Sequence, residues 1–543
     1  MPPCGSTLPH CVKDSMTDYL IVGGGSAGCV LAARLSEDPD VRVLLLEAGG
    51  RDDHPEIHIP VAFSRLFQTE ADWNYHTVPQ PGAADRSLYW PRGKVLGGSS
   101  AINAMIYIRG HHADYDGWAA DGCEGWGYAD VLPYFKRSED NGRGASAYHG
   151  VGGPLRVEDP ADPSPVSLAV VEAAEAAGLP RNADFNGAEQ AGTGLYQLTQ
   201  RGGRRASAAT AFLKPARSRD NLTVRTGALV HRVVVERGRA VGVEVAIDGR
   251  VETIRAEREV IVCGGAVNSP QLLMLSGIGP ADSLRALGID VVADRPAVGA
   301  NLQDHLIVWL LYALKEPVSL VNADAVLSGL RYLVSRRGML ASNVAEAGAF
   351  VDSTGGGGVP DLQFHVAPAK FENHGLERPT DHAFSLGPTL VRPRSRGRLT
   401  LRSADPEAHP AIDPQALAEP ADVDVLVAGL RLAREIAEAA PLDRFRGDLA
   451  SPGLASFATA DLERYVRRSC ETLYHPVGTC RMGADEDAVV DPALRVRGVE
   501  ALRVVDASVM PTIPNGNTNA PTLMIAERAA DLIAARETAL SGA

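Results

Sequence analysis

Residues 18–47 carry a hydrophobic pattern that predicts a strand, a turn, a helix and a second strand. An apolar run at 19–22 precedes a glycine-rich stretch at 23–28, a helical run follows, and a second apolar run occupies 41–46. Short apolar runs on either side of a helix are typical of neighbouring buried strands in a parallel sheet. We therefore expect the chain to begin with a βαβ unit.

The pattern of buried strands continues further along the chain. Residues 221–246 alternate as two strands joined by a turn at 237–239, and residues 260–262 form a short apolar strand. A helix is predicted over 269–275, with Pro270 at its first position, where the missing N–H needs no partner.

Between residues 311 and 471 the character of the pattern changes. Segments such as 361–365 and 398–402 alternate apolar and polar residues, which predicts an antiparallel sheet with one open face. Buried patterns return as a strand at 502–506 and a helix at 522–535. The first domain is therefore predicted to be discontinuous in sequence, with a second domain inserted into it.

The glycine-rich stretch after the first strand predicts a dinucleotide site. Gly23 permits a tight turn, Gly25 lets a pyrophosphate approach the backbone, and Gly28 lets the helix pack close to the sheet. The exposed N–H groups at the start of the helix face the phosphates. Glu47 ends the second strand, where a carboxylate accepts both hydroxyls of an adenosine ribose. This motif does not distinguish FAD from NAD.

Composition and charge narrow the classes of partner. The 543 residues are 45% hydrophobic and 22% charged, as in ordinary globular proteins. A net charge of −14 argues against nucleic acid or an anionic membrane surface as a partner. No apolar run approaches the roughly 18 residues that a spanning helix needs.

The cysteines and histidines do not form recognisable metal or disulfide motifs. The seven cysteines are scattered, without a C-x-x-C pair, so we expect free thiols and a cytoplasmic location. Neither H-E-x-x-H nor paired cysteines occur, so no metal site is expected.

Four longer motifs point to a family. They are GKVLGGSSAINAMIYIRG at 93–110, GAVNSPQLLMLSGIG at 265–279, YHPVGT at 474–479 and NTNAPT at 517–522. Together they resemble the glucose–methanol–choline (GMC) oxidoreductases, and most closely the bacterial choline dehydrogenase-like and alcohol oxidase-like members. The resemblance extends over residues 18–533 and implies FAD rather than NAD.

The resemblance also implies an α/β fold, in which a Rossmann-like FAD-binding domain carries an inserted α+β substrate domain built on an antiparallel sheet flanked by helices. The predicted boundaries are a disordered tail at 1–15, an FAD-binding domain at 16–158, 200–310 and 472–543, and a substrate domain at 159–199 and 311–471.

The family pattern places the following residues around the flavin nucleotide: Gly23, Gly25, Ser26, Ala27, Gly28, Glu47, Ala48, Trp73, Arg92, Gly93, Val95, Gly97, Gly98, Asn103, Ala104, Met105, Val230, Cys263, Gly264, Tyr474, Asp506, Ala507, Asn517, Pro521 and Thr522. Some members carry a histidine, covalently bonded to the flavin, immediately before the residue that matches Asn103. Ile102 occupies that position here, so the FAD is expected to be held non-covalently.

The implied reaction is oxidation of a primary alcohol to an aldehyde. A base must remove the hydroxyl proton while the flavin N5 accepts a hydride from carbon. The family motif at 474–479 implies His475 as that base, and neutral imidazole suits the role because it titrates near operating pH. Asn519 is expected to orient the substrate oxygen from the other side, and its alternative role is a helix N-cap.

The substrate contacts are less sharply indicated. Glu346 matches a position where choline-oxidising relatives place a carboxylate, and its alternative is a structural hydrogen bond. His365 either lines the site or faces the core, and Tyr474 either walls the substrate or packs on the flavin. A hydroxynitrile lyase that uses flavin as a scaffold, a choline-specific dehydrogenase and a catalytically idle flavoprotein stay as alternatives. The sequence does not choose the alcohol, the acceptor (dioxygen or a quinone-like molecule) or the oligomeric state.

Overall fold

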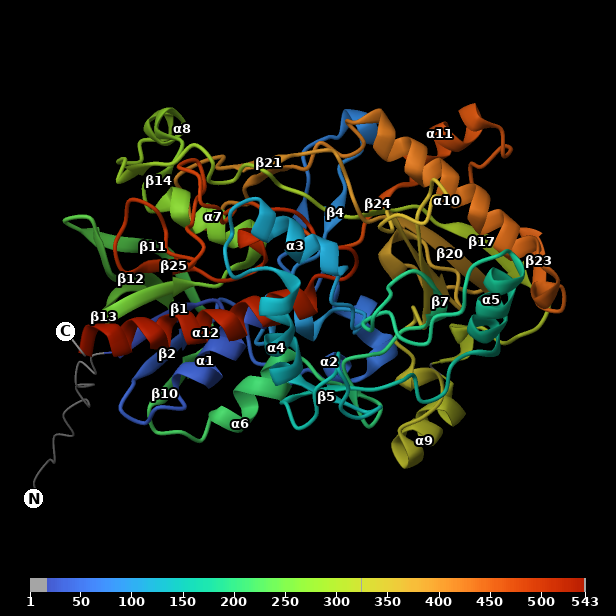
Figure 1. Cartoon of the computed structure of the whole chain (residues 1–543), viewed down its shortest axis with the longest axis horizontal. Helices are drawn as coiled ribbons and strands as arrows, with labels where there is room; N and C mark the ends of the chain where they lie inside the picture. Colours follow the sequence, from blue (N-terminus) through green and yellow to red (C-terminus); the bar gives the residue numbers. More distant parts are fainter. Residues whose placement is uncertain (1–16, 324, 542–543) are drawn as a thin grey trace, which may run out of the picture.

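The protein consists of two lobes, each built on its own sheet. The computed structural model describes residues 17–323 and 325–541, so the predicted tail at 1–15 lies outside them. Figure 1 shows the two sheets side by side along the longest axis, with the amino-terminal strands in one lobe and β17, β20 and β23 in the other. The chain passes between the lobes several times, because each sheet takes strands from distant parts of the sequence.

The first lobe contains a seven-stranded, mostly parallel sheet. Its order runs from β10 (Leu222–Arg225) through β2 (Val43–Leu46), β1 (Thr17–Val22) and β13 (Arg250–Val262) to β12 (Arg239–Ile247) and β11 (Ala228–Glu236), and β25 (Leu502–Val504) also pairs with β13. The amino-terminal half of β13 pairs antiparallel with β12, and its carboxyl-terminal half pairs parallel with β1. This confirms the α/β class of the first domain.

Two helices that lie far apart in sequence pack together on this sheet. They are α1 (Ser26–Leu35) and α12 (Asn519–Ser541). The fully buried carboxylate of Glu527 on α12 accepts hydrogen bonds from Arg34 on α1 at 2.9 and 2.8 Å, and from Arg137 of α4 (Tyr128–Ser138) at 2.7 Å. The starts of the two helices are joined by the Ser26 hydroxyl, which donates to Asn519 Oδ1 at 2.8 Å, so the start of α12 lies beside the glycine turn.

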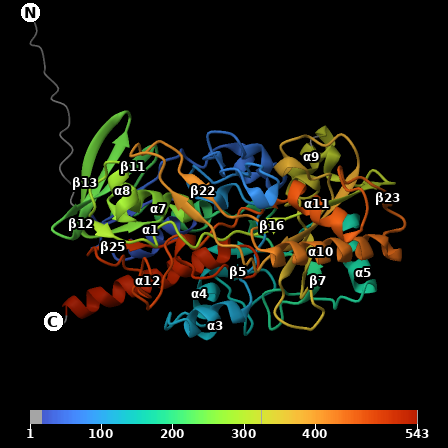
Figure 2. The same cartoon turned by 90° about the horizontal axis from the view of Figure 1, so that it is seen from above.

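The second lobe contains an eight-stranded antiparallel sheet. Its order is β23 (Arg446–Leu449), β17 (Leu310–Leu314), β20 (Ala383–Leu390), β19 (Leu362–Ala367), β18 (Ala347–Val351) and β7 (Gly192–Leu195). In addition, β16 (Leu306–Ile307) pairs with β20, and β24 (Glu471–Thr472) pairs with β16. Figure 2 shows α10 (Pro420–Glu438) along this lobe and α12 along the other. The domain boundaries given above stay a prediction.

The expectation of one open face on this sheet is wrong. All six residues of β19 are buried. Leu362, Phe364 and Val366 belong to the same hydrophobic cluster as residues of α10 and of α5 (Pro165–Ala176), which cover that face. The opposite face, which carries His365, borders a cavity between the lobes instead of solvent. Alternation along the strand therefore marks two different buried environments.

Two further predictions, the strand from residue 221 and the start of the helix at residue 269, are wrong because of a glycine and a proline. The strand predicted from residue 221 is broken at Gly227, whose φ of 66° turns the chain, so β10 runs parallel to β2 whereas β11 pairs antiparallel with β12. Helix α7 (Gly265–Leu275) begins before the predicted residue 269 and contains Pro270 in its interior. Pro270 cannot donate to the carbonyl of Ala266, and the Thr479 hydroxyl donates to that carbonyl at 2.7 Å instead.

The segment predicted as a strand at 398–402 also pairs differently. Strand β21 (Arg398–Thr400) forms a separate two-stranded sheet with β22 (Ala411–Asp413). The other helices of six or more residues are α3 (His112–Ala120), α8 (Ala281–Ala286), α9 (Val326–Ser335) and α11 (Thr459–Ser469). Among the described residues, none of the helices has the length and apolar character needed to cross a membrane.

Candidate active site

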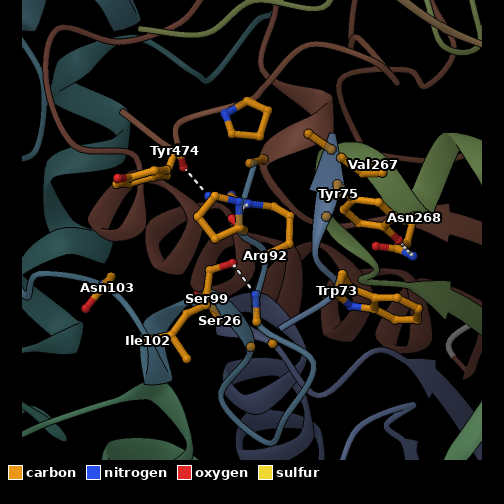
Figure 3. Close-up of a pocket in the computed structure, with 18 of the residues that line it drawn as sticks. Ser26, Trp73, Tyr75, Arg92, Ser99, Ile102, Asn103, Val267, Asn268 and Tyr474 are labelled. Carbon is orange, nitrogen blue, oxygen red and sulfur yellow. Dashed lines mark hydrogen bonds between the residues drawn. The ribbon is translucent and has the colours of Figure 1, made fainter. Parts of the chain in front are cut away.

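A long cavity runs from the glycine turn of the first lobe to the inner face of the second sheet. Figure 3 shows Arg92 between Tyr474 and Ser99, with Trp73, Tyr75 and Asn268 on one side and Ile102 and Asn103 on the other. The predicted site residues that line it are Gly23, Gly25, Ser26, Ala27, Glu47, Ala48, Trp73, Arg92, Gly93, Gly98, Asn103, Ala104, Met105, Val230, Cys263, Gly264, His365, Tyr474, His475, Asp506, Ala507, Asn517, Asn519 and Thr522. Gly28, Val95, Gly97, Pro521 and Glu346 are not among the lining residues.

The glycine turn has no room for side chains at Gly23 and Gly28. A Cβ added at Gly28 would lie 1.9 Å from the carbonyl oxygen of Gly23, and one added at Gly98 would lie 2.7 Å from the Cα of Gly25. Gly23 has a φ of 103°, which side-chain-bearing residues rarely adopt. Backbone therefore forms this wall of the cavity at the start of α1, as a pyrophosphate requires. Gly28 contributes through close packing rather than by lining the cavity.

Glu47 is fixed by two backbone donors. Its Oε2 accepts from the N–H of Gly24 at 2.7 Å, and its Oε1 accepts from the N–H of Gly49 at 2.8 Å. Burial raises the pKa of Glu47 to about 7, although both backbone donors act in the opposite direction. The carboxylate reaches the cavity with a fixed orientation, which suits a ribose diol.

The next part of the cavity presents planar and polar groups. Trp73 stacks on Tyr75 with ring centroids 5.8 Å apart, and Asn268 donates to the Tyr75 hydroxyl at 2.7 Å. Asp506 accepts from the N–H of Gly265 at 2.9 Å and from Ser269 Oγ at 2.5 Å. The Asp506 carboxylate therefore holds the start of α7 against the cavity. Backbone at the glycine turn, aromatic faces and the oriented carboxylate of Glu47 together fit an FAD molecule.

One carboxylate holds two histidine backbones side by side. Asp304 Oδ1 accepts from the N–H of His305 at 2.9 Å and from the N–H of His475 at 2.8 Å. Asp304 Oδ2 accepts from the Trp90 indole at 2.7 Å and from the Thr472 hydroxyl. This buried carboxylate joins the segment before β16 to the segment after β24. The adjacent Asp304–His305 pair is the sequence signal that could have pointed to it.

The hydrogen bonds of these histidines determine which nitrogen of His475 carries the proton. His305 Nε2 lies 3.2 Å from the carbonyl oxygen of Val391, which only accepts, so this nitrogen carries a proton. In the neutral ring, His305 Nδ1 is then an acceptor, and His475 Nδ1 donates to it at 3.0 Å. His475 Nε2 is left without a proton, 3.2 Å from the donating Nδ2 of Asn517. The geometry thus provides an unprotonated imidazole nitrogen at the cavity wall.

Burial keeps both rings neutral. It lowers the pKa of His305 to about 3, and it lowers the pKa of His475 well below its usual range. The neighbouring His305, His365 and Arg92 act on His475 in the same direction as burial. The pair therefore has the protonation state of a base rather than of an acid.

The structure places the amide of Asn517, rather than that of Asn519, beside His475. Asn519 is the first residue of α12, and its Oδ1 accepts from the hydroxyl of Ser26 at 2.8 Å, beside the glycine turn. Asn517 lies in the loop before the helix, and its amide contacts His475. Both asparagines line the cavity, but they lie at different parts of it. Because the packing of α12 on α1 fixes Asn519 near Ser26, the amide that meets the imidazole is Asn517.

Glu346 does not face the cavity. Its carboxylate accepts from the N–H of Ser164 at 2.7 Å, from Ser167 Oγ at 2.7 Å and from Ser342 Oγ at 2.6 Å. These contacts match the structural alternative for Glu346. They join β18 to the start of α5, and they use the oxygens that a substrate cation would need.

His365 and Tyr474 both line the cavity. His365 Nδ1 lies 3.1 Å from Thr389 Oγ1, whereas its buried Nε2 has no hydrogen-bond partner among the described residues. The Tyr474 hydroxyl bonds to His374 Nδ1 at 2.7 Å, and its ring lies 5.7 Å from that of Phe67. His365 therefore offers a polar atom in this region, and Tyr474 contributes to the aromatic wall.

Comparison with known proteins agrees with this arrangement. Residues 17–307 and 393–526 match two family models, both described as GMC oxidoreductase. An alcohol dehydrogenase (acceptor) of Pseudomonas putida is 46% identical over 528 residues, covering 95% of this chain and 96% of that protein. A mitochondrial choline dehydrogenase of Mus musculus is 46% identical, covering 98% of this chain and 91% of that protein.

A solved structure extends the comparison to three dimensions. Pyridoxine 4-oxidase from Mesorbium loti superposes with a TM-score of 0.88 at 38% identity, covering 95% of this chain and 98% of that one. The family models cover more than half of the chain, and the sequence relatives match it over nearly its whole length. Such relationships indicate an enzyme that acts on CH–OH donors with FAD as its cofactor. The chain belongs to the GMC oxidoreductase family.

Proposed function

We propose that the protein oxidises a primary alcohol to the aldehyde, with His475 as the base and with FAD held non-covalently. The observation that carries this proposal is the unprotonated Nε2 of His475 beside the amide of Asn517 at the wall of a cavity that fits FAD. The relatives named for alcohol or choline dehydrogenation support the same type of reaction. Ile102 lines the cavity at the position of the covalent histidine and offers no nucleophile.

FAD, when bound, supplies a hydride acceptor. The residues of the chain prepare the alcohol for oxidation. The hydroxyl O–H bond breaks as the proton passes to His475 Nε2, and the positive charge that develops is shared with His305 through the Nδ1–H bond. As the alcohol replaces the Asn517 amide at His475 Nε2, the Asn517 Nδ2 donates instead to the developing alkoxide, without titrating. The glycine turn, Glu47 and Asp506 hold the cofactor in place.

The engagement of Glu346 away from the cavity favours an uncharged alcohol over choline, whereas the aromatic wall accepts either. Phe63, Phe67, Trp309 and Phe371 line the cavity together with Tyr474. Glu346, the expected partner of a substrate cation, is engaged by three donors away from the cavity. We therefore assign the substrate class as apolar aliphatic or aryl primary alcohols. Either dioxygen or a quinone-like acceptor completes the cycle.

The test is anaerobic mixing of the purified yellow protein with a panel of alcohols. Apolar primary alcohols are expected to bleach the oxidised flavin absorbance faster than choline does. Adding dioxygen or an artificial quinone to the reduced protein identifies the acceptor, and hydrogen peroxide reports the first case. If no alcohol bleaches the flavin, or if carbonyl product forms while the flavin stays oxidised, the proposal is wrong.

The pH dependence of flavin reduction follows from the lowered pKa of His475. A base acts only while it is deprotonated, so its activity is lost as pH falls through its pKa. Because burial, His305, His365 and Arg92 lower that pKa, the loss is expected well below pH 6.5. Rapid-mixing rates at saturating alcohol across acid pH provide the measurement, with the unreacted flavin spectrum as the control for integrity. A midpoint at or above pH 6.5 would contradict a lowered pKa of His475.

The two asparagines are expected to respond differently to substitution. Asn517→Ala removes the amide beside His475 and should lower the rate of flavin reduction by roughly 10²-fold or more, as loss of one alkoxide donor does elsewhere. Asn519→Ala removes the contact with Ser26 near the glycine turn and should weaken FAD retention more than the rate of the loaded enzyme. Equal rate losses with equal FAD content would show that Asn517 has no special role.

A further inference from the structure

Helix α9 presents an apolar stripe to solvent. Val326, Leu327, Leu330, Leu333 and Val334 are 79%, 80%, 53%, 66% and 87% exposed. Their spacing along the helix puts them on one face, whereas Tyr332 lies on the opposite face and is buried at 3% exposure. The Tyr332 hydroxyl donates to the carbonyl of Gly203 at 2.9 Å. The helix is therefore attached by its inner edge and turns its apolar face outward.

The position of α9 leaves this stripe accessible. Figure 1 shows α9 at the periphery of the second lobe, on the side opposite α10, and Figure 2 again separates the two helices. Surface apolar residues that occur singly need no explanation, but contiguous large ones mark an interaction surface. The five residues lie within a single ten-residue helix, which makes the patch contiguous.

Arginines lie on α9, at its carboxyl-terminal end and along its inner edge. Arg331 lies on α9 and pairs with Asp162 at 2.5 Å while its side chain stays 60% exposed. Arg336 and Arg337 follow the helix directly. Arg201 and Arg204 are exposed on the hairpin of β8 (Gln200–Arg201) and β9 (Arg204–Arg205). Gly203 of this hairpin packs so closely on the carbonyl of Arg336 that an added Cβ would lie 2.1 Å from it.

We propose that α9 docks the enzyme on an anionic lipid bilayer surface, with the apolar stripe inserted at the headgroup boundary and the arginines against the lipid phosphates. An apolar helix face bordered by cations is the pattern of interfacial helices. The net charge of −14 argued against an anionic membrane surface as a partner. At physiological salt, however, charges more than about 8 Å away are screened. The arginines near α9 therefore determine its interaction with the lipid surface.

A second copy of the chain suits this face less well. A symmetric dimer joins the same patch of both subunits, so the arginines around α9 would approach their own copies. Like charges at such a contact disfavour association. An anionic surface, by contrast, satisfies the apolar stripe and the arginines together.

The docked helix leads directly into the wall of the cavity. From α9 the chain continues through the short helix η6 (Met339–Ala341) to Val344 and Ala345, which line the cavity. The segment that follows α9 therefore reaches the wall of the cavity. The docking itself depends on neither the substrate nor the reaction.

The experiment is flotation of the holoenzyme with vesicles of phosphatidylcholine alone or of equal parts phosphatidylcholine and phosphatidylglycerol. The parent protein is expected to float with the anionic vesicles and to be released by high salt. The triple variant L327S/L330S/V334S should lose the binding. The double variant R336Q/R337Q should bind anionic vesicles roughly 30-fold less tightly. The double variant V151S/V251S, which changes residues that are 52% and 56% exposed elsewhere, should bind like the parent.

Flavin content and a thermal melt provide the folding control, and all variants should match the parent in both. If the parent ignores anionic vesicles, or if the α9 variants float as it does, the proposal is wrong. A parent dimer in sedimentation velocity that the triple serine variant abolishes, without vesicle binding, would assign the face to a second copy instead. Because flotation needs no substrate, failure of the proposed alcohol oxidation leaves this test unaffected.

Discussion

His475→Ala is expected to lower the rate of flavin reduction by an alcohol by about 10²–10⁴-fold, the range that a positioned general base contributes. The reason is that Nε2 of His475 is the unprotonated nitrogen at the cavity wall, while its Nδ1 is occupied with His305. Anaerobic rapid mixing of the yellow variant with substrate measures the effect. FAD content should be unchanged, because the backbone N–H of His475 still bonds to Asp304.

His382→Ala serves as the matched control. His382 bonds to Ser319 at 2.7 Å and is not among the residues that line the cavity, so its loss should leave the rate near that of the parent. A slow His475→Ala variant that regains activity with added imidazole would strengthen the assignment. A variant that reduces its flavin as fast as the parent would remove His475 from the chemistry.

Gly28→Ala is expected to yield protein with little or no FAD and with reduced thermal stability. The added Cβ would lie 1.9 Å from the carbonyl oxygen of Gly23, a distance that no rotation of a side chain relieves. Helix α1 must therefore move away from the turn, which displaces the N–H groups that would face the pyrophosphate. Overpacking of this kind costs typically about 1–3 kcal/mol of stability. Visible flavin absorbance relative to protein absorbance and a thermal melt provide the two readouts.

Gly117→Ala is the control for this substitution. Gly117 lies within α3, and an added Cβ would meet nothing within 4 Å. This change should keep the flavin and alter stability by no more than about 1 kcal/mol, in the stabilising direction. If Gly28→Ala retains the flavin as well as Gly117→Ala does, close packing at the turn is not what positions the cofactor.

Much of the fold and part of the site could be predicted from the sequence, because their causes are local. The apolar runs define β1 and β2, and the glycines between them fix the turn through backbone sterics alone. The predictions from sequence are wrong where a residue interacts with a residue far away in the sequence. The interior proline of α7 is tolerated because Thr479 bonds to the carbonyl of Ala266, and nothing near Pro270 in the sequence announces that contact.

In the active site, too, local features could be predicted from the sequence, whereas contacts between distant segments could not. The sequence alone determined the glycine turn, the acid that ends β2 and the segment that carries His475, since short-range sterics and motif order fix each of them. Only the tertiary structure decided that Asn517 rather than Asn519 meets the imidazole, because the packing of α12 on α1 ties Asn519 to Ser26. It also decided that Glu346 turns toward serines and that His305 sets the tautomer of His475. Hydrogen bonds between segments far apart in the chain determine these choices, so no local pattern could encode them.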